Sequence, residues 1–391
     1  MQSDIYVIGS GHTKFGRLEQ NLEELIVEAA QEAIAEADID PADIDAIYLG
    51  HFNSGLVSDG FASSLVQQTH PDLRFKPATR CENACASGAA AIFNAMNLIE
   101  AGKARNVLVV GAEKMTHRST ADVTTALAGA GYQNDPHEAS LSFPQVFGIA
   151  AQAYTERYGN PLDAMARIAA KNHANAMKNP LAQMHRPLTF EQCREVTDKN
   201  PLIAPPLRLS DCSLITDGAA AIVLSSGQGK AASAKRRVRM AGAEHVSDYL
   251  PMGRRDFIAF EGPERAIQAA YRRAGITVAN VDFAEVHDCF TIAELLIYEA
   301  MGLAAKGQGA SAIEEGRVLA EGKTPVNLSG GLKAKGHPVG ATGVSMHALG
   351  FRQLTGQAGE MQRKSAEWGL VFNMGGAAVA NYASVLQADR A

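Results

Sequence analysis

The chain has 391 residues, of which 46% are hydrophobic and 20% charged, a composition typical of a globular protein with a large core. Its formal net charge of -6, without a dense run of Lys and Arg, argues against nucleic acid or an anionic membrane as the main partner. No apolar run reaches the roughly 20 residues of a membrane helix, no secretory signal is recognisable, and five cysteines without framework spacing predict reduced thiols in a cytoplasmic protein.

The first part of the chain alternates predicted strands and helices. A strand at residues 5–8 precedes Gly9-Ser10-Gly11, which lacks the third glycine of a dinucleotide-binding fingerprint, so we discount that motif. A helix is predicted from 21 to 37 with Asn21 as its cap, and strands are predicted at 45–49 and 107–110. This alternation is typical of a layered α/β domain.

Residues 81–92 form a segment of small residues that we interpret as a tight loop running into a helix. Apolar residues then recur at helical spacing as far as Ile99. Cys85 is therefore predicted at a helix N-terminus, where free N–H groups and a partial positive charge favour the thiolate and lower the thiol pKa. The alternative is an inert, buried cysteine beside a close contact between a helix and a strand.

The rhythm of strands and helices breaks between about residues 115 and 215, a proline-rich stretch with predicted helices at 145–158 and 163–177. We interpret it as one long insertion over the face of the domain, because long insertions in compact domains usually bind or cover something. A strand at 217–224 returns to the core, and 227–237 is predicted to be a linker.

The second part of the chain repeats the first. Three segments recur in order: 29–45 at 266–282, 86–88 at 341–343, and 218–220 at 376–378. In the first pair, a shift of 237 positions brings seven identical residues together. The repeats predict two similar α/β halves, residues 1–227 and 238–391, whose equivalent loops meet at a shared seam.

Residue types suited to catalysis gather in three segments of the second half, at 285–290, 327–343 and 372–376. Each segment leaves or enters a predicted core element. Because of the duplication, we expect each of them to face Cys85.

The motifs in these segments and around Cys85 resemble those of the thiolase superfamily. G-H-P-x-G-A-T-G stands at 336–343, H-D-C-F at 287–290 and C-A-S-G at 85–88. The chain is most similar to the branch of sterol-carrier-protein-type (SCP2) and archaeal thiolases, since ordinary thiolases carry N-E-A-F in place of H-D-C-F. The resemblance spans nearly the whole chain. It implies an α/β fold, a layered αβαβα sandwich of duplicated halves, in which the insertion corresponds to the family's loop domain.

The resemblance also implies a reaction, the cleavage of a 3-oxoacyl-CoA or the reverse Claisen condensation. Cys85 would attack the 3-keto carbon, and His337 would activate Cys85 and help to bind a carbonyl oxygen. The C-x-G cysteine that protonates the leaving carbanion in ordinary thiolases is absent, because Asn373 stands there. Cys289 would supply that proton instead.

Oxyanion stabilisation is implied at two places. His287 would polarise one carbonyl oxygen, and the backbone N–H groups of Cys85 and Gly375 would hold the oxyanion of the acyl-enzyme step. Phe290 and Ser329 are weaker candidates for substrate binding. Other residues near these motifs are expected to be structural: Cys81, Cys193, Cys212 and Asp288.

The implied ligands are acyl-CoA, acetyl-CoA and CoA, with CoA as a substrate and no resident cofactor. A metal site made from Cys81, Cys85, His287 and Cys289 is disfavoured, because no compact metal-binding spacing occurs. The family resemblance implies a homodimer or homotetramer active in lipid and fatty acid metabolism. A small zinc-ribbon/OB-fold protein is a possible further partner.

Two other functions remain open at this point. A decarboxylating condensing enzyme of the ketoacyl-synthase type uses one cysteine with two histidines, a set that Cys85, His287 and His337 would supply. A non-catalytic, thiolase-like subunit would bind CoA thioesters inside a larger complex. Neither the acyl-chain length nor the direction of the reaction can be read from the sequence.

Overall fold

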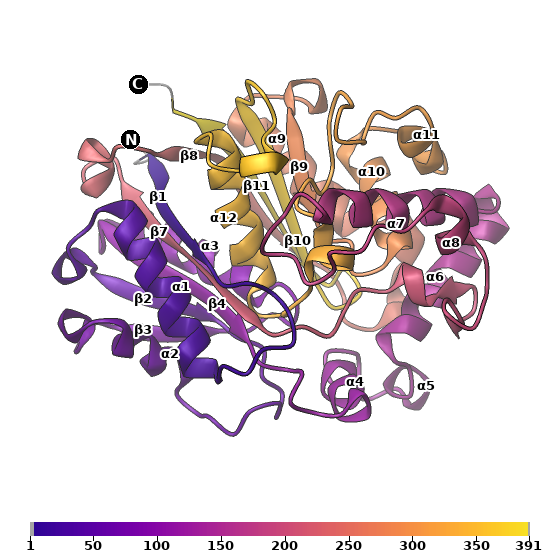
Figure 1. Ribbon diagram of the computed structural model, residues 1–391, viewed down its shortest axis with the longest axis horizontal. Coiled ribbons are helices and arrows are strands. Elements are labelled where there is room, and N and C mark those ends of the chain that lie inside the picture. Colours follow the sequence, from indigo (N-terminus) through magenta and orange to yellow (C-terminus); the bar gives the residue numbers. More distant parts are fainter. Residues whose placement is uncertain (1–3, 390–391) are drawn as a thin grey trace.

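A computed structural model of the chain describes residues 4–389 (Figure 1). Nine strands form one mixed sheet in the order β3-β2-β4-β7-β1-β8-β11-β10-β9. The strands of this sheet are β1 (Ile5–His12), β2 (Ala46–Gly50), β3 (Ala78–Cys81), β4 (Asn106–Glu113), β7 (Gly218–Ser226), β8 (Val238–Ser247), β9 (Phe283–Val286), β10 (Trp368–Gly375) and β11 (Ala380–Ala388). Strands β5 (Leu202–Ala204) and β6 (Leu207–Arg208) pair separately.

The α-helices differ in length and in the layer that they occupy. They are α1 (Leu22–Ala37), α2 (Ala62–Leu65), α3 (Ser87–Glu100), α4 (Thr120–Ala128), α5 (Pro136–Ala139), α6 (Phe143–Tyr158), α7 (Leu162–Ala176), α8 (Phe190–Arg194), α9 (Glu261–Ala274), α10 (Thr291–Met301), α11 (Gly309–Glu314) and α12 (Thr342–Leu354). No helix among the described residues is both long and apolar enough to cross a membrane.

The large sheet consists of two half-sheets, one from each half of the chain. Among residues 4–389, two residue pairs, Tyr6 with Arg239 and Val7 with Val238, join them, where β1 meets β8. Helix α1 packs on the outer face of the first half-sheet and α9 on that of the second, while α3 and α12 pack between the two (Figure 1). The predicted αβαβα sandwich of two α/β halves is therefore confirmed.

The duplication extends to individual hydrogen bonds. Helices α1 and α9 are each followed by a short 3-10 turn, Pro41–Asp43 in one half and Val278–Asn280 in the other, again 237 positions apart. The carboxylate of Asp45 then accepts two backbone N–H groups at the start of the neighbouring strand β4. Asp282 does the same at the start of β10. Equivalent aspartates thus link equivalent pairs of strands in the two halves, β2 with β4 and β9 with β10.

The central helices α3 and α12 touch through small residues at their N-termini. A Cβ atom added to Gly88 would lie 2.8 Å from the carbonyl oxygen of Gly340. One added to Gly343 would lie 2.4 Å from the backbone nitrogen of Ala89. Because Cys85 directly precedes α3 and His337 precedes α12, this close packing brings their two loops together.

The predicted insertion forms a layer of its own, in which α4 to α8 lie together at one side of the molecule (Figure 1). The predicted helices at 145–158 and 163–177 are observed as α6 and α7, which pack against α10. Side chains of α7 bond directly to the second half: Lys171 donates to the Val326 carbonyl and Asn175 to that of Asn327. The insertion is therefore attached firmly to the loops of the second half.

Candidate active site

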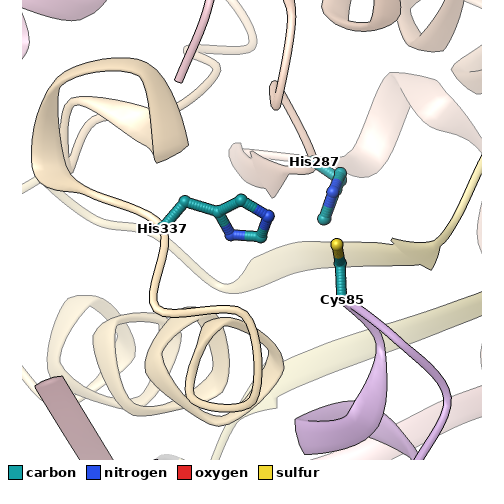
Figure 2. A group of neighbouring side chains, drawn as sticks. All are labelled: Cys85, His287 and His337. Atoms are coloured by element: carbon teal, nitrogen blue, oxygen red, sulfur yellow. The ribbon is translucent and has the colours of Figure 1, made fainter. Parts of the chain in front are cut away.

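Three loops from distant parts of the chain bring Cys85, His287 and His337 together (Figure 2). Cys85 lies between β3 and α3, His287 follows β9, and His337 precedes α12. Their sulfur and ring nitrogen atoms lie within 4.8 Å of one another. The two imidazole rings stand nearly perpendicular, with centroids 5.1 Å apart. The segments 285–290 and 327–343 therefore face Cys85 as expected, and Gly376 of the third segment lines the same cavity.

The three side chains line one cavity of about 240 Å³ between the sheet and the insertion. Cys289 and Phe290 belong to the same lining, together with residues of α4 and of the segment 212–215. Most of the lining is apolar, and Cys85, His287 and His337 supply reactive polar groups. Such a cavity suits a ligand with an apolar body and a single reactive group.

His337 is held as a neutral base. The hydroxyl of Thr342 donates to the Pro338 carbonyl, at 3.0 Å, so it accepts from Nδ1–H of His337, at 2.7 Å. The other nitrogen, Nε2, therefore carries a lone pair. Burial, and secondarily the charge of Lys335, lower the pKa of His337 to about 3. A neutral imidazole of this kind can take a proton from a nearby thiol.

His287 carries its proton on the opposite nitrogen. The amide nitrogen of Asn373 lies 3.2 Å from the Cys85 carbonyl oxygen, which can only accept, and 2.9 Å from Nδ1 of His287. Nδ1 therefore accepts, and Nε2 carries the hydrogen. Within residues 4–389, this buried Nε2 has no hydrogen-bond partner. His287 consequently presents a free donor in the cavity wall.

The Cys85 thiol is protonated in the free enzyme. Burial raises its pKa to about 12, although the backbone N–H groups of Gly376 and of Cys85 itself act in the opposite direction. The prediction of a lowered pKa is therefore wrong. The helix N-terminus contributes less than the loss of water around the sulfur costs. Forming a thiolate therefore requires a base, and a ring nitrogen of the neutral His337 lies within 4.8 Å of the sulfur.

Cys289 is also protonated, because burial raises its pKa well above the ordinary value, with further contributions from Cys85 and Asp288. Its side chain lies in the cavity lining, and its carbonyl accepts the N–H of Ser213 at 2.9 Å. Asp288 accepts the backbone N–H groups of Leu332 and Lys333. Asp288 thus braces the turn as predicted, and Cys289 is a protonated thiol in the cavity lining.

The weaker candidates differ in position. Phe290 lines the cavity and stacks on Phe147, with ring centroids 4.6 Å apart. Ser329 lies outside the lining, and its hydroxyl donates to Glu285 at 2.5 Å. Gly375 ends β10, and its neighbour Gly376 is the residue that reaches the cavity.

Of the cysteines expected to be structural, Cys81 and Cys193 are buried away from the cavity, whereas Cys212 lines it.

Sequence reasoning missed the roles of Asn373 and Thr342. In the sequence, Asn373 stands out only because it occupies the position of the missing cysteine. Thr342 stands out only as part of the G-H-P-x-G-A-T-G motif. The two residues set the protons on the two histidines through contacts that local sequence does not reveal. An asparagine inside a buried strand was the one available signal.

Cys85, His287 and His337 also have the ligand types of a zinc site. Each ring has one nitrogen engaged by Asn373 or Thr342, which leaves one free nitrogen per ring. These free atoms are the ones that acyl transfer would use. The prediction that no metal is bound stays a prediction.

Comparison with known proteins decides the family. The model of the thiolase N-terminal domain matches residues 5–228, and that of the thiolase C-terminal domain-like family matches 243–388. The chain belongs to the thiolase family. It is similar to an acetyl-CoA acetyltransferase of Methanothermobacter thermautotrophicus, with 37% identity over 95% of this chain and 96% of the relative.

Two further comparisons define its branch and fold. The chain is 32% identical to sterol carrier protein 2 of Homo sapiens, over 95% of this chain and 70% of that protein. The structure of an Ltp2-ChsH2(DUF35) aldolase superposes with a TM-score of 0.80 at 23% identity, covering 99% of this chain and 98% of that one. The resemblance to the SCP2-type and archaeal branch is confirmed. The protein is an acyltransferase with thiolase activity.

Proposed function

We propose that the enzyme exchanges acyl groups between acyl-CoA and acetyl-CoA through an acyl group on Cys85. One observation carries the proposal. Cys85 meets a histidine that can accept a proton and a second histidine that can donate one, inside a single apolar cavity. The first histidine, His337, suits activation of the thiol. The second, His287, suits a carbonyl oxygen that becomes negative.

In the cleavage direction, Cys85 passes its proton to Nε2 of His337 and attacks the 3-keto carbon. The negative oxygen that forms is held by backbone N–H groups. Cys85 and Gly375 are the donors expected from the sequence, and Gly376, which lines the cavity, is a third candidate. The bond between the α- and β-carbons then breaks, and its electron pair moves to the thioester, whose oxygen becomes an enolate. His287 Nε2–H and the protonated His337 stabilise that oxygen.

Cys289 completes the first half of the reaction by giving its proton to the α-carbon, which releases acetyl-CoA. The resulting Cys289 thiolate takes the proton of an incoming CoA thiol, and the CoA sulfur attacks the acyl group on Cys85. The Cys85 thiolate leaves and regains its proton from His337. All protons return to their starting atoms, so one cycle restores the enzyme.

The decarboxylating alternative needs the cysteine and both histidines but has no use for Cys289. The presence of Cys289 in the same cavity therefore favours thiolysis. The named acyltransferase relatives, which match nearly the full length, speak against a non-catalytic subunit.

The proposed substrates are acyl-CoA, acetyl-CoA and CoA, in line with the named activity of the Methanothermobacter relative. A role in fatty acid metabolism and a cytoplasmic location belong to the same proposal. We further propose a homodimer or homotetramer, because β3 forms an open edge of the sheet. The Ltp2-ChsH2(DUF35) aldolase contains a second named component, which supports the proposal of a small partner protein.

The test is thiolysis of acetoacetyl-CoA by free CoA, followed as the loss of the 3-keto thioester. Cys85→Ala and Cys289→Ala should each abolish turnover, while Cys193→Ala, a buried cysteine outside the cavity, should keep it. Incubation of the native enzyme with acetyl-CoA should add one acetyl group to Cys85, detectable by mass spectrometry. Turnover that survives Cys289→Ala would refute its role and favour the two-histidine alternative.

A further inference from the structure

A second cavity lies on the other side of the segment 212–214. Its volume is about 590 Å³, and Cys212, Ser213 and Leu214 line both this cavity and the reaction cavity. The remaining lining comes from α7, from residues 184–200 of the insertion, from Leu209 and Ser210, and from Lys333. A single stretch of chain therefore separates the second cavity from the acyl-transfer site.

Lys333 is the unusual member of this lining. Its side chain belongs to a residue that is only 4% exposed, yet within residues 4–389 its ammonium group has no hydrogen bond and no ion pair. The other buried lysines of this region are partnered: Lys335 donates to Ser345, and Lys171 pairs with Glu294. A buried charge without a direct partner is costly, and burial lowers the pKa of Lys333. A ligand that offers an anionic oxygen would supply the missing partner.

Charges of both signs surround Lys333. The carboxylates of Asp211 and Asp288 act on it without a direct contact, and each is engaged elsewhere, Asp211 by Arg208 and Asp288 by two backbone N–H groups. Arg186 and Lys199 line the exposed rim of the cavity, where Glu195 contributes one opposite charge. Inside, His173 donates from Nδ1 to the Arg186 carbonyl, at 2.9 Å. Its buried Nε2 has no partner among the described residues. A bound anion would favour the charged form of both Lys333 and His173.

We propose that this cavity binds an anionic oxygen group of the CoA thioester, with Lys333 as its main contact. Two groups have the required chemistry: a carboxylate at the far end of the acyl chain, and a phosphate of CoA. The shared wall at 212–214 places the ammonium beside a cavity in which the thioester of the same molecule would lie. The inference rests on the proposed function, since that function supplies a CoA thioester.

The test compares ligand affinities by calorimetry in a Cys85→Ala background, which prevents acylation. Adipyl-CoA and hexanoyl-CoA have equal chain length and differ by one carboxylate. Hexanoyl-CoA and hexanoyl-pantetheine differ by all the phosphates. A hydrogen bond to a charged group contributes about 1.5–3 kcal/mol, so Lys333→Met should weaken the ligand that carries the bound anion by about 10- to 100-fold.

The pattern of losses identifies the anion. A loss confined to adipyl-CoA assigns the cavity to the acyl carboxylate. A loss for both CoA esters that spares hexanoyl-pantetheine assigns it to a CoA phosphate. Equal affinities before and after the substitution, or an equal loss for all three ligands, would overturn the proposal. Lys103→Met, an exposed lysine outside the cavity lining, is the matched control.

Two checks keep the result interpretable. Lys333→Met removes a buried unpaired charge, so its melting temperature should not fall, and Lys333→Arg should keep the preference for the anionic ligand. Thiolysis of acetoacetyl-CoA by the native enzyme is measured in parallel. If that turnover is absent, the proposed function fails, whereas the binding pattern still reports on the cavity.

Discussion

His287 and His337 face the same sulfur with opposite protonation patterns, and each pattern is fixed by one neutral side chain. Thr342 holds the proton of His337 on Nδ1, and Asn373 holds that of His287 on Nε2. Neither contact involves a charge. The site therefore assigns an acceptor and a donor by hydrogen-bond direction, which keeps both rings neutral in a desolvated cavity.

Replacing Asn373 with Asp should reverse the donor on His287. A carboxylate at this position accepts, so Nδ1 of His287 would carry the hydrogen and Nε2 would lose it. We expect kcat to fall by about 10²–10³-fold, the usual effect of losing one oxyanion donor, with a smaller change in KM. Steady-state thiolysis of acetoacetyl-CoA measures both constants.

The control for this substitution is Asn381→Asp in the neighbouring strand β11. Asn381 is buried and donates to the Ala378 carbonyl, outside the cavity lining. The Asn381→Asp variant should lose about as much stability as Asn373→Asp, but its kcat should fall much less. Equal kcat values for Asn373→Asp and the native enzyme would contradict the assigned protonation of His287.

The residues that line the cavity with Cys85 could be predicted from the sequence, but their protonation states could not. The motifs around Cys85, Cys289 and His337 pointed to residues that line one cavity in the structure. The pKa of Cys85 was predicted in the wrong direction, because local sequence shows the helix N-terminus and hides the burial supplied by distant segments. The protonation of His287 depends on Asn373, 86 positions further along the chain.

At the scale of elements, the contact between α3 and α12 controls the geometry of the site. Gly343→Ala would place a Cβ 2.4 Å from the backbone nitrogen of Ala89 and 2.5 Å from the side-chain oxygen of Asn373. Because the Ala89 atom is part of the backbone of α3, a side-chain rotation cannot relieve the contact, and α3 and α12 must move apart. We expect a loss of at least about 1–3 kcal/mol in the free energy of unfolding, together with lower kcat, measured by urea unfolding and thiolysis.

Gly350→Ala is the matched control on the same helix. Its added Cβ would meet the end of the flexible Leu386 side chain at 2.7 Å. A rotamer change can relieve that contact, so both stability and kcat should change less. If the two variants behaved alike, the close approach of α3 and α12 would not be what positions Cys85 and His337.

Asp217 joins three elements at the point where the insertion returns to β7. Its buried carboxylate pairs with Lys114 at 2.9 Å and accepts the backbone N–H groups of Met115 and Thr116. Burial raises its pKa, but the hydrogen bonds from Thr116, Met115 and Lys114 outweigh that effect and leave the pKa lowered. Asp217→Asn should cost about 3–5 kcal/mol at neutral pH, because Lys114 stays buried without its partner.

The same variant has a predicted pH dependence. A carboxyl group whose pKa is lower in the folded state stabilises the protein above its unfolded pKa, near 3.9, and loses this effect as the pH falls through the folded pKa. The difference between native and variant should therefore shrink in acid. Asp38→Asn, which removes an exposed ion pair with Lys235, should cost no more than about 1 kcal/mol. Urea titrations at several pH values test both statements.

For the whole molecule, internal repetition made the fold predictable. The shift that aligned 29–45 with 266–282 also aligned the 3-10 turns and the bonds of Asp45 and Asp282, which the sequence alone did not show. The course of the insertion and the cavity beside Lys333 were not predictable. They depend on contacts between α7, the segment 184–200 and the second half, which follow no local periodicity.

The open edge of the sheet predicts how two copies associate. Among the described residues, strand β3 pairs only with β2. The backbone N–H groups of Ile47 and His51, in and just after β2, donate to the carbonyls of Pro77 and Cys81. Since alternate residues of a strand face alternate sides of the ladder, Ala78 and Arg80 point their backbone groups outward. In the described residues, no strand pairs with that side. An edge of this kind is a template for pairing with another chain.

Arg80→Pro should therefore convert the proposed dimer into a monomer. Proline removes the outward N–H group and leaves the bonds to β2 intact, because edge positions tolerate proline. Arg80→Ala keeps the N–H group and should remain dimeric, which separates the backbone effect from loss of the guanidinium. Light scattering coupled to size exclusion gives the mass of each variant. A dimeric Arg80→Pro protein would show that the copies associate through another surface. Cys85 lies only four residues past the end of β3. Thiolysis measured on the same fractions would therefore show whether activity depends on the pairing.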